Sequence, residues 1–365
     1  MKSIALIGGK LQGFEVAYLA KKAGINVVLV DRNKNPLIKN MVDDFHCFDI
    51  IEQPENLIDI SRIVDGIIPV NENLETIEFL KSIRDKLECP ILFDFDAYQI
   101  SMDKKRSKEY FKSIDVPTPL DNPTVPPFFI KPPCQSSSVG TSIIYNKEGL
   151  EGLDPSMLVE EYISGNVISL EVVGDGSNFA VIKETKVHVD DTYDCHMVTP
   201  IGHYPAFRDI SYKLAKNLKL RGIMDVEAID SLRGLKVLEI DARFPSQTPT
   251  VVYHCTGINL VELLFQAFSG GVQELAVAPG NNYCIFEHLT PQGGKLVPIG
   301  EHMISQGNDY SEFHISDGLE IFECRGKKNI FTLISWGSSK DEMVVNRQKG
   351  MKIINEYLGI DKQGA

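Results

Sequence analysis

The sequence predicts a protein of mixed α/β and α+β class with three parts: a Rossmann-like N-terminal domain, a central α+β domain and a small C-terminal domain. Three observations lead to this prediction. Strand and helix patterns alternate over the first ninety-odd residues, β-rich patterns follow a proline-rich stretch at 116–127, and a strand-rich tail ends in a helix pattern. A chain of 365 residues also exceeds the size at which one hydrophobic core usually suffices.

The N-terminal domain is expected to cover residues 1–95. Residues 4–9 (IALIGG) are typical of a buried strand that ends in glycines, and 14–24 (FEVAYLAKKAG) of an amphipathic helix. Further buried strands are expected at 27–31, 65–70 and 90–94, with a helix between the last two. Such alternation predicts a parallel, doubly wound sheet.

The central and C-terminal domains are expected at 96–260 and 261–365. A helix at 104–114, capped by Ser101 or Asp103, precedes the proline-rich connection. Strands are then expected at 127–132, 157–163, 167–176, 179–189, 223–230 and 235–244. An amphipathic helix at 258–271 follows, then a strand-rich tail from about Asn281 and a final helix near Val344–Leu358.

Composition excludes several classes of function. The net charge of −13 argues against nucleic-acid binding, which rests on Lys and Arg pairing with phosphates. The apolar start is too short for a signal peptide, and nothing later approaches about 18 apolar residues. Seven cysteines, odd in number and without a CxxC pair, predict free thiols in a reducing compartment. We therefore expect a cytoplasmic protein that binds neither nucleic acid nor membranes; the sequence does not reveal its oligomeric state.

The most informative segment is 222–250 (GIMDVEAIDSLRGLKVLEIDARFPSQTPT). Side chains alternate along a strand, so Asp225 and Glu227 share one face, and in the next strand so do Glu239 and Asp241. With the turn centred near Arg233, Glu227 lies opposite Glu239 and Asp225 opposite Asp241.

Four carboxylates on one patch of sheet repel one another and call for cations. Mg²⁺ suits a few carboxylates plus substrate phosphates, and Arg243 on the same face could meet an anionic reacting group. The alternative is an exposed face whose carboxylates point into water. The apolar opposite face and the small polar run after Arg243 favour a site.

Three further segments suit a polyphosphate nucleotide. Lys131 ends a strand before a loop that contains Ser136, Ser137, Ser138 and Gly140, whose N–H groups and hydroxyls could approach phosphate oxygens. Lys104 lies in the first turn of its helix. Glu160 and Glu161 end a buried strand, where the backbone could contact adenine and a carboxylate the ribose. Each segment also has an ordinary interpretation, as a hairpin loop, a solvated basic helix face and a solvated strand end.

The loop from Gly8 to Gly13 follows a strand and opens a helix, so its N–H groups suit an anion. Lys10 replaces the second glycine of a dinucleotide fingerprint. Asp31, at the end of the second strand, could bind a ribose or an ammonium group, and a vestigial Rossmann turn is the alternative. The segment 188–197 (HVDDTYDCHM) invites a metal interpretation, which we reject in favour of a polar surface segment or a lid.

Taken in order, Lys104, Lys131, the serine loop, LVEEYI, Glu227 and EIDAR resemble the pattern of ATP-grasp ligases. The segments GGKLQGFEVAYLAKKAG, PVNENLETIEFL, KPPCQSSSVG, VHVDDTYDCHMVTP, GIMDVEAI and EIDARFPSQTPT further resemble the PylC family, the ATP-grasp ligases of pyrrolysine biosynthesis in methanogens. This resemblance runs over almost the entire chain. It implies an ATP-grasp architecture and an ATP-dependent ligase, which joins the carboxylate of (3R)-3-methyl-D-ornithine to the ε-amine of L-lysine through an acyl phosphate.

The resemblance also implies roles for individual residues. ATP would be bound by Lys104, Lys131, Ser138, Glu160, Glu161, Tyr162 and Ile163, with Lys10 and Asp31 as anion and hydroxyl contacts. Two Mg²⁺ ions would be held by Glu227, Glu239 and Asp241, while Arg243, Lys104 and Lys131 act in catalysis. The ornithine moiety would meet Ser169, Leu170, Glu171, Asp225, Arg243, Ser246, Gln247 and Thr248. Lysine would contact Leu11, Gln12 and Glu72.

Three positions depart from the superfamily pattern. Serines replace the usual glycines of the phosphate loop, Asp241 replaces an Asn, and Val167 replaces a Glu that often follows the hinge glycine. For the base that deprotonates the lysine amine, Glu72 and Asp191 are candidates. Other functions stay open: a different ATP-grasp amino-acid ligase, a nicotinamide-dependent reductase that uses Asp31, and a non-catalytic nucleotide or amino-acid sensor.

Overall fold

A computed structural model describes residues 2–134, 140–273, 282–307, 309–326 and 328–360. Its N-terminal part is a four-stranded parallel sheet of β1 (Ser3–Ile7), β2 (Asn26–Asp31), β3 (Asp44–Cys47) and β4 (Gly66–Pro69) in the order β3-β2-β1-β4. Helices α1 (Leu11–Lys22), α2 (Pro54–Ser61) and α3 (Leu74–Ile83) connect the strands, with short 3-10 turns at Lys39–Met41 (η1) and Arg84–Lys86 (η2). The predicted parallel sheet is confirmed.

The strand predicted at 90–94 is wrong. Ile91 forms an isolated parallel bridge with Ile67, and the chain then leaves the sheet. The reason is local: the Asp94 side chain accepts from the backbone N–H groups of Asp96 and Ala97 and so begins a helix, α4 (Phe95–Ser101). Helix α5 (Lys104–Ser113) follows, and of its two candidate caps the structure uses Asp103.

The rest of the chain builds two sheets. A small one contains β6 (Ser142–Ile144), β5 (Phe128–Lys131) and β7 (Leu158–Glu161), in that order. The large antiparallel sheet runs β12-β11-β8-β9-β10-β13-β17-β16-β15, and β14 pairs with β13. Its strands are β8 (Asn166–Asp175), β9 (Phe179–Val189), β10 (Cys195–Pro200), β11 (Arg221–Ser231), β12 (Gly234–Asp241), β13 (Tyr283–Gln292), β14 (Lys295–Pro298), β15 (Asp309–Ser316), β16 (Leu319–Arg325) and β17 (Ile330–Gly337).

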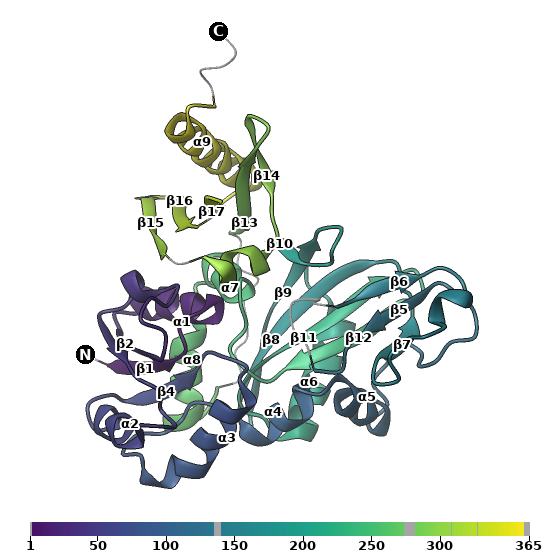
Figure 1. The fold of residues 1–365 in the computed structure, drawn as a ribbon, viewed down its shortest axis with the longest axis horizontal. Coiled ribbons are helices and arrows are strands. Elements are labelled where there is room, and N and C mark those ends of the chain that lie inside the picture. The colour runs from purple at the N-terminus through teal and green to yellow at the C-terminus, as the bar shows by residue number, and fades with distance from the viewer. Residues whose placement is uncertain (1, 135–139, 274–281, 308, 327, 361–365) are drawn as a thin grey trace.

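The C-terminal strands therefore continue the central sheet, because β13 pairs with β10 at Met197–Glu287 and Val198–Phe286. Domain boundaries at 95 and 260 stay a prediction. The remaining helices are α6 (Pro205–Leu218), α7 (Thr248–Thr256), α8 (Leu260–Ser269), α9 (Lys340–Leu358) and the 3-10 turns η3 (Glu148–Leu150) and η4 (Glu301–Gln306). Figure 1 shows the large sheet extending from the central strands to β13.

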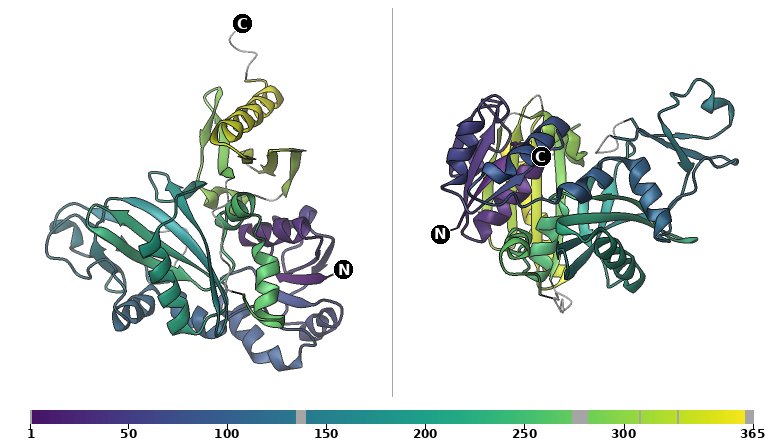
Figure 2. Two further views of the ribbon diagram at one scale, coloured as in Figure 1. Left: turned by 180° about the vertical axis from the view of Figure 1, so that it is seen from behind. Right: turned by 90° about the horizontal axis from the view of Figure 1, so that it is seen from below.

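Helices α7 and α8 join the N-terminal sheet to the large sheet. Both contact α1, and α8 also contacts β8 and β11; Figure 2 shows α8 standing beside the N-terminal strands. In the part of the chain that the structure describes, no single helix is long and apolar enough to cross a bilayer, and only α7 and α8 taken together, bent by 93°, pass a test of length and composition.

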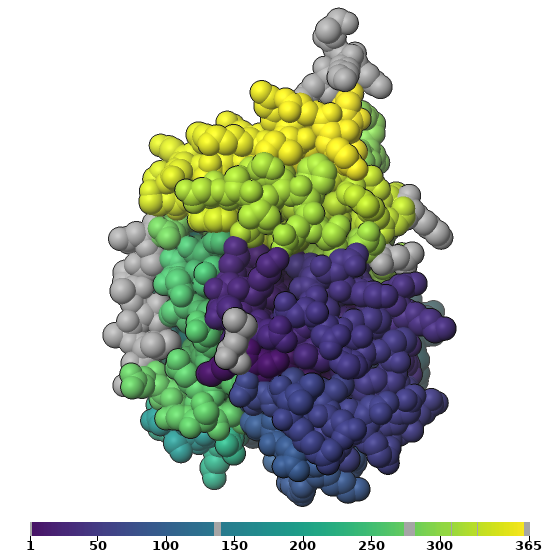
Figure 3. Space-filling view, turned by 90° about the vertical axis from the view of Figure 1, so that its left-hand side faces the viewer, coloured from purple at the N-terminus to yellow at the C-terminus, as the bar shows by residue number. Residues whose placement is uncertain are grey.

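The C-terminal strands also rest directly on the N-terminal domain, as the space-filling view in Figure 3 shows. The Tyr18 hydroxyl lies 2.7 Å from Nε2 of His254, and the His254 ring stacks on Trp336 at a centroid distance of 4.0 Å. At the rim, Lys22 forms an ion pair with Glu320. These contacts hold the C-terminal strands against α1 and α7.

A buried carboxylate caps α7 from another element. Glu15, in α1, accepts hydrogen bonds from the backbone N–H and the hydroxyl of Thr250 at 3.1 and 2.6 Å. Burial raises the pKa of Glu15 from its ordinary 4.5 to about 8, against the lowering effect of these hydrogen bonds. The folded protein therefore keeps this proton to a higher pH than the unfolded chain does.

We expect Glu15→Gln to change how stability depends on pH. Between pH 4.5 and about 8 the unfolded wild type releases a proton that the folded state retains, so its stability falls as pH rises, by at most about 1.4 kcal/mol per pH unit. The amide carries no such proton but can still accept from Thr250. Urea unfolding from pH 5 to 8 should show the wild type losing stability relative to Glu15→Gln, while Glu262→Gln, at an exposed position of α8, runs parallel to wild type. A constant difference would contradict the prediction.

Candidate active site

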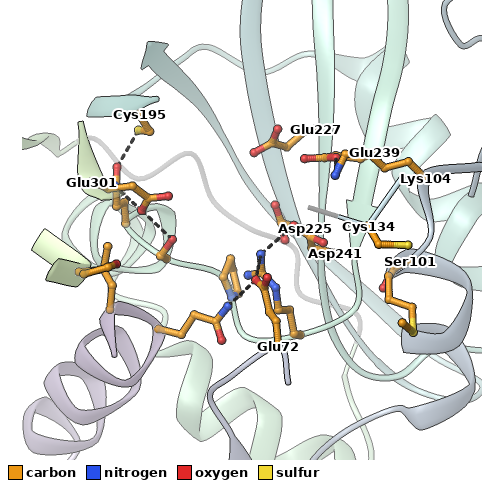
Figure 4. Close-up of a pocket in the computed structure, with 18 of the residues that line it drawn as sticks. Glu72, Ser101, Lys104, Cys134, Cys195, Asp225, Glu227, Glu239, Asp241 and Glu301 are labelled. Atoms are coloured by element: carbon orange, nitrogen blue, oxygen red, sulfur yellow. Dashed lines mark hydrogen bonds and ion pairs between the residues drawn. The ribbon is translucent and has the colours of Figure 1, made fainter. Parts of the chain in front are cut away.

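One cavity of about 1020 Å³ lies where the N-terminal sheet, the large sheet and the small sheet meet. Its wall includes residues from both ends of the chain, from Ile7 to Ser305. Figure 4 shows carboxylates from two neighbouring strands on one side of the cavity and Glu301 on the opposite side. Most of the residues predicted from sequence are among those that line it.

The predicted carboxylate hairpin is confirmed in its register. In the β11–β12 pair Glu227 lies opposite Glu239 and Asp225 opposite Asp241, with a bulge after Glu227 and the turn closed by Ser231 and Gly234. All four acids line the cavity. The alternate residues Met224, Val226 and Ala228 are fully buried in the core on the other face, so the acids are held toward the cavity.

Burial, together with the neighbouring charges, shifts the pKa values of these four acids. Burial raises the pKa of Glu227 to about 8, and the charges of Glu239 and Asp241 add to the effect. Burial likewise raises the pKa of Asp241 to about 6, against the attraction of Arg243, and raises that of Asp225 well above its usual range. Glu239 differs: burial is outweighed by Lys104 and Lys131, so its pKa is lowered.

Two predicted cationic residues already contact these acids. Lys104 Nζ lies 2.7 Å from Glu239 Oε2. Arg243 Nη2 lies 3.0 Å from Asp241 Oδ2 and 2.7 Å from Glu72 Oε1. Arg243 thereby links the large sheet to the N-terminal domain. The alternative interpretation, an exposed sheet face whose carboxylates point into water, is therefore wrong.

The donor chemistry of the hairpin fits Mg²⁺. Carboxylate oxygens are the ligands that this ion prefers, and the buried Asp225 Oδ1 has no hydrogen-bond partner among the described residues. As the side chains stand, no three His, Cys, Asp or Glu residues of the described segments are gathered closely enough to hold a metal ion. The role of Glu227, Glu239 and Asp241 as ligands stays a prediction.

The predicted nucleotide side of the cavity is built on the small sheet. Lys131 is buried, with Nζ 3.1 Å from Oε2 of Glu160, and Lys108 Nζ lies 2.7 Å from the other oxygen of that carboxylate. The Glu160 side chain thus holds two lysines in place. Oε1 of Glu161 accepts from the backbone N–H of Leu120 at 2.9 Å. These two acids, Tyr162 and Ile163 line the cavity. Ser138, with Ser136 and Ser137, lies outside the described residues.

The N-terminal loop also faces the cavity. Its wall here includes Lys10, Leu11, Gln12, Asp31 and Glu72. The Asp31 carboxylate accepts from the backbone N–H groups of Gly9 and Asn33, both at 2.7 Å, and so fixes the glycine turn. Gln12 Nε2 donates to Glu72 Oε1 at 2.8 Å. Asp191, the other candidate base, is exposed and does not line the cavity.

Three predicted substrate contacts lie on β8, the strand that pairs with β11. Glu171 lies opposite Asp225, and Ser169 opposite Glu227. Both are fully buried, and the Ser169 hydroxyl has no hydrogen-bond partner among the described residues. Burial raises the pKa of Glu171 to about 7, against the lowering effect of the Thr248 hydroxyl. Leu170 belongs to the core on the opposite face. None of the three lines the cavity, whereas Ser246, Gln247 and Thr248 do.

Sequence reasoning missed the part of the wall that comes from β10 and η4. Asp194, Cys195, Glu301 and Ser305 line the cavity there. Asp194 is buried and accepts from the backbone N–H of His302 at 3.1 Å. The acidic residues at 190–194 could have indicated that Asp194 belongs to the site, although we interpreted this segment as a polar surface segment or a lid. Glu301 carries no local pattern, because its neighbours come from distant segments.

The fold and the site define a class, the ATP-grasp enzymes. The family model of the ATP-grasp domain matches residues 101–247. Two solved structures share the fold: biotin carboxylase from Campylobacter jejuni (TM-score 0.71, 15% identity, 94% of this chain and 89% of that one) and N5-carboxyaminoimidazole ribonucleotide synthetase from Thermotoga maritima (TM-score 0.70, 18% identity, 97% and 98%). At these identities the likeness concerns the fold alone.

The family follows from relatives that match over nearly the whole chain. The 3-methyl-D-ornithine–L-lysine ligase of Methanosarcina barkeri is 60% identical over 360 residues, which cover 98% of this chain and 99% of that protein. The ligase of the same name from Methanosarcina mazei is 58% identical, covering 98% and 97%. The chain belongs to the family of 3-methyl-D-ornithine–L-lysine ligases, and it is an ATP-dependent carbon–nitrogen ligase.

Proposed function

We propose that this ligase joins the carboxylate of (3R)-3-methyl-D-ornithine to the ε-amine of L-lysine, with ATP converted to ADP. The family assignment supports the reaction class and the substrates. The observation in the structure that carries the chemistry is the carboxylate hairpin, whose four acids face one cavity together with Lys104 and Arg243. Membership of a ligase family also argues against the two other functions considered from the sequence, a nicotinamide-dependent reductase and a non-catalytic sensor.

In the proposed reaction the ornithine carboxylate attacks the γ-phosphate of ATP and forms an acyl phosphate, with ADP as leaving group. When bound, two Mg²⁺ ions, held by Glu227, Glu239 and Asp241, would neutralise phosphate charge. Lys104 and Lys131 add fixed positive charge beside the transferring group, and Arg243 stabilises the acyl phosphate. The neutral ε-amine of lysine then attacks the acyl carbon, phosphate leaves, and the amine loses a proton.

An acidic cavity suits two cationic amino acids. Besides the hairpin acids, Glu72, Asp194 and Glu301 line its wall. Glu72 is held by Arg243 and Gln12, so it offers a fixed carboxylate near the N-terminal loop where we place lysine. A cavity with this many carboxylates favours diamino acids over neutral or acidic ones.

We also place the reaction in pyrrolysine biosynthesis in the cytoplasm. The seven cysteines are all free, as expected in a reducing compartment. The pathway follows from the proposed product and the family resemblance.

The function is tested by mixing the enzyme with ATP, Mg²⁺, 3-methyl-D-ornithine and L-lysine. We expect ADP, phosphate and a product with the mass of both amino acids less one water. Lysine whose ε-amine is acetylated should give no product, because that nitrogen is no longer nucleophilic. Formation of AMP in place of ADP, or an amide formed with the ε-blocked lysine, would contradict the proposal. Omission of Mg²⁺ in the presence of a chelator should abolish turnover.

A further inference from the structure

The loop that follows Arg243 contains a strained turn at Gln247. Its backbone has φ +66° and ψ −47°, and the Ser246 carbonyl accepts from the Thr248 N–H at 2.8 Å. A hydrogen bond that spans three residues with these angles is a γ-turn of the rare type with positive φ. A residue with a side chain persists in such a conformation only where its surroundings enforce it.

The surroundings of Gln247 enforce this backbone conformation. The side chain is 1% exposed, and both ends of its amide are used. Nε2 donates to Oε2 of Glu301 at 2.7 Å, and Oε1 accepts from Sγ of Cys195 at 2.7 Å. The same Glu301 oxygen accepts from the Ser246 hydroxyl at 3.1 Å. Figure 4 shows Glu301 and Cys195 together on the side of the cavity opposite the hairpin acids.

These contacts give Glu301 a distinct position in the molecule. It begins η4, which follows β14 in the C-terminal segment, yet its hydrogen bonds go to the loop between β12 and α7. Hydrogen bonds to a carboxylate are stronger than those between neutral groups. The C-terminal segment therefore reaches across the cavity and fixes the shape of a loop whose three residues, Ser246, Gln247 and Thr248, all line the wall.

We propose that Glu301 is a positioning residue for recognition of the diamino acid, because it holds Gln247 in the γ-turn that presents Ser246 and Thr248 to the cavity. This inference rests on the proposed function and deepens it. It also revises the expected role of Gln247: its side chain anchors the loop, since its amide is already occupied by Glu301 and Cys195. The Ser246 hydroxyl donates its proton to Glu301, but its oxygen can still accept from an ammonium group of the ligand.

Glycine provides the decisive test, because without a Cβ it adopts positive φ freely. Glu301→Ala should raise KM for 3-methyl-D-ornithine by at least about tenfold and leave KM for ATP unchanged. Gln247→Ala should do the same, since it keeps the strain and loses the anchor. In the double variant Glu301→Ala/Gln247→Gly the turn no longer needs its anchor, so KM for 3-methyl-D-ornithine should return toward the wild-type value.

Alternative roles for Glu301 give different results. If Glu301 bound an ammonium group of the ligand directly, the glycine double variant would stay as impaired as Glu301→Ala, which would overturn the inference. If Glu301 were only structural, its loss would lower the active fraction and hence kcat without changing KM, which would overturn it too. Glu301→Gln, whose amide oxygen can still accept from Gln247, should stay within about threefold of wild type. A wild-type enzyme that forms no amide would instead refute the proposed function.

Discussion

Replacing Glu239 with glutamine is expected to lower kcat for amide formation by at least about 100-fold. Glu239 is the acid of the hairpin whose pKa is lowered, because Lys104 and Lys131 outweigh the effect of burial. It is therefore the hairpin acid best suited to stay ionised when the cavity fills. The amide is neutral and offers one weak oxygen donor, so both the Lys104 contact at 2.7 Å and the affinity for Mg²⁺ should suffer.

Two quantities are measured over a range of Mg²⁺ concentrations. They are the rate of ADP release, followed by a coupled colorimetric assay, and the mass of the product. Because the loss is partly in metal affinity, high Mg²⁺ should recover some of the rate of Glu239→Gln. Glu109→Gln is a matched control, since Glu109 is an exposed acid on α5, the helix that carries Lys104. A Glu239→Gln enzyme that keeps more than a tenth of wild-type kcat at all Mg²⁺ concentrations would refute a ligand role.

Loss of Arg243 is expected to have a similarly large effect. Arg243→Ala should lower kcat by about 100-fold or more, because the acyl phosphate would lose its fixed cationic partner. The same change leaves Asp241 and Glu72 without the guanidinium that contacts both, and unfolding free energy should fall by about 1–3 kcal/mol. Arg243→Lys should recover little activity, since an ammonium group cannot reproduce the planar fork of donors.

Steady-state rates and urea unfolding separate these two effects. Arg233→Ala is the control, because Arg233 lies at the exposed hairpin turn with 81% of its side chain accessible and should leave both quantities nearly unchanged. Wild-type-like kcat in Arg243→Lys would show that charge alone suffices at this position, and the proposed geometry of acyl-phosphate stabilisation would then be wrong.

Local patterns were sufficient to predict the hairpin and much of the fold. Side-chain alternation fixed which face each acid of the hairpin would occupy, and the short connection around Arg233 fixed the register. The parallel N-terminal sheet and the α5 and α8 helices followed from apolar periodicity and, for α5, from the candidate cap Asp103. In each case the information lies within a dozen residues of the element.

The remaining features depend on contacts between distant segments. Nothing near Glu301 in the sequence indicates that it would meet Gln247, more than fifty residues earlier. The predicted strand at 90–94 failed because Asp94 begins a helix, a choice that apolar content alone does not reveal. Alternation along β8 places Glu171 on the same face of the sheet as the hairpin acids, but it does not say whether the side chain lines the cavity. The structure buries Glu171 outside the cavity lining.

The pairing of β13 with β10 has a practical consequence for dissecting the enzyme. A fragment that stops at residue 260 would expose the backbone N–H and C=O groups along one side of β10, a bare edge that invites other chains to pair with it. The same cut would remove Glu301. A nucleotide-binding fragment that ends at the predicted domain boundary would therefore tend to aggregate and would lack part of the active-site wall.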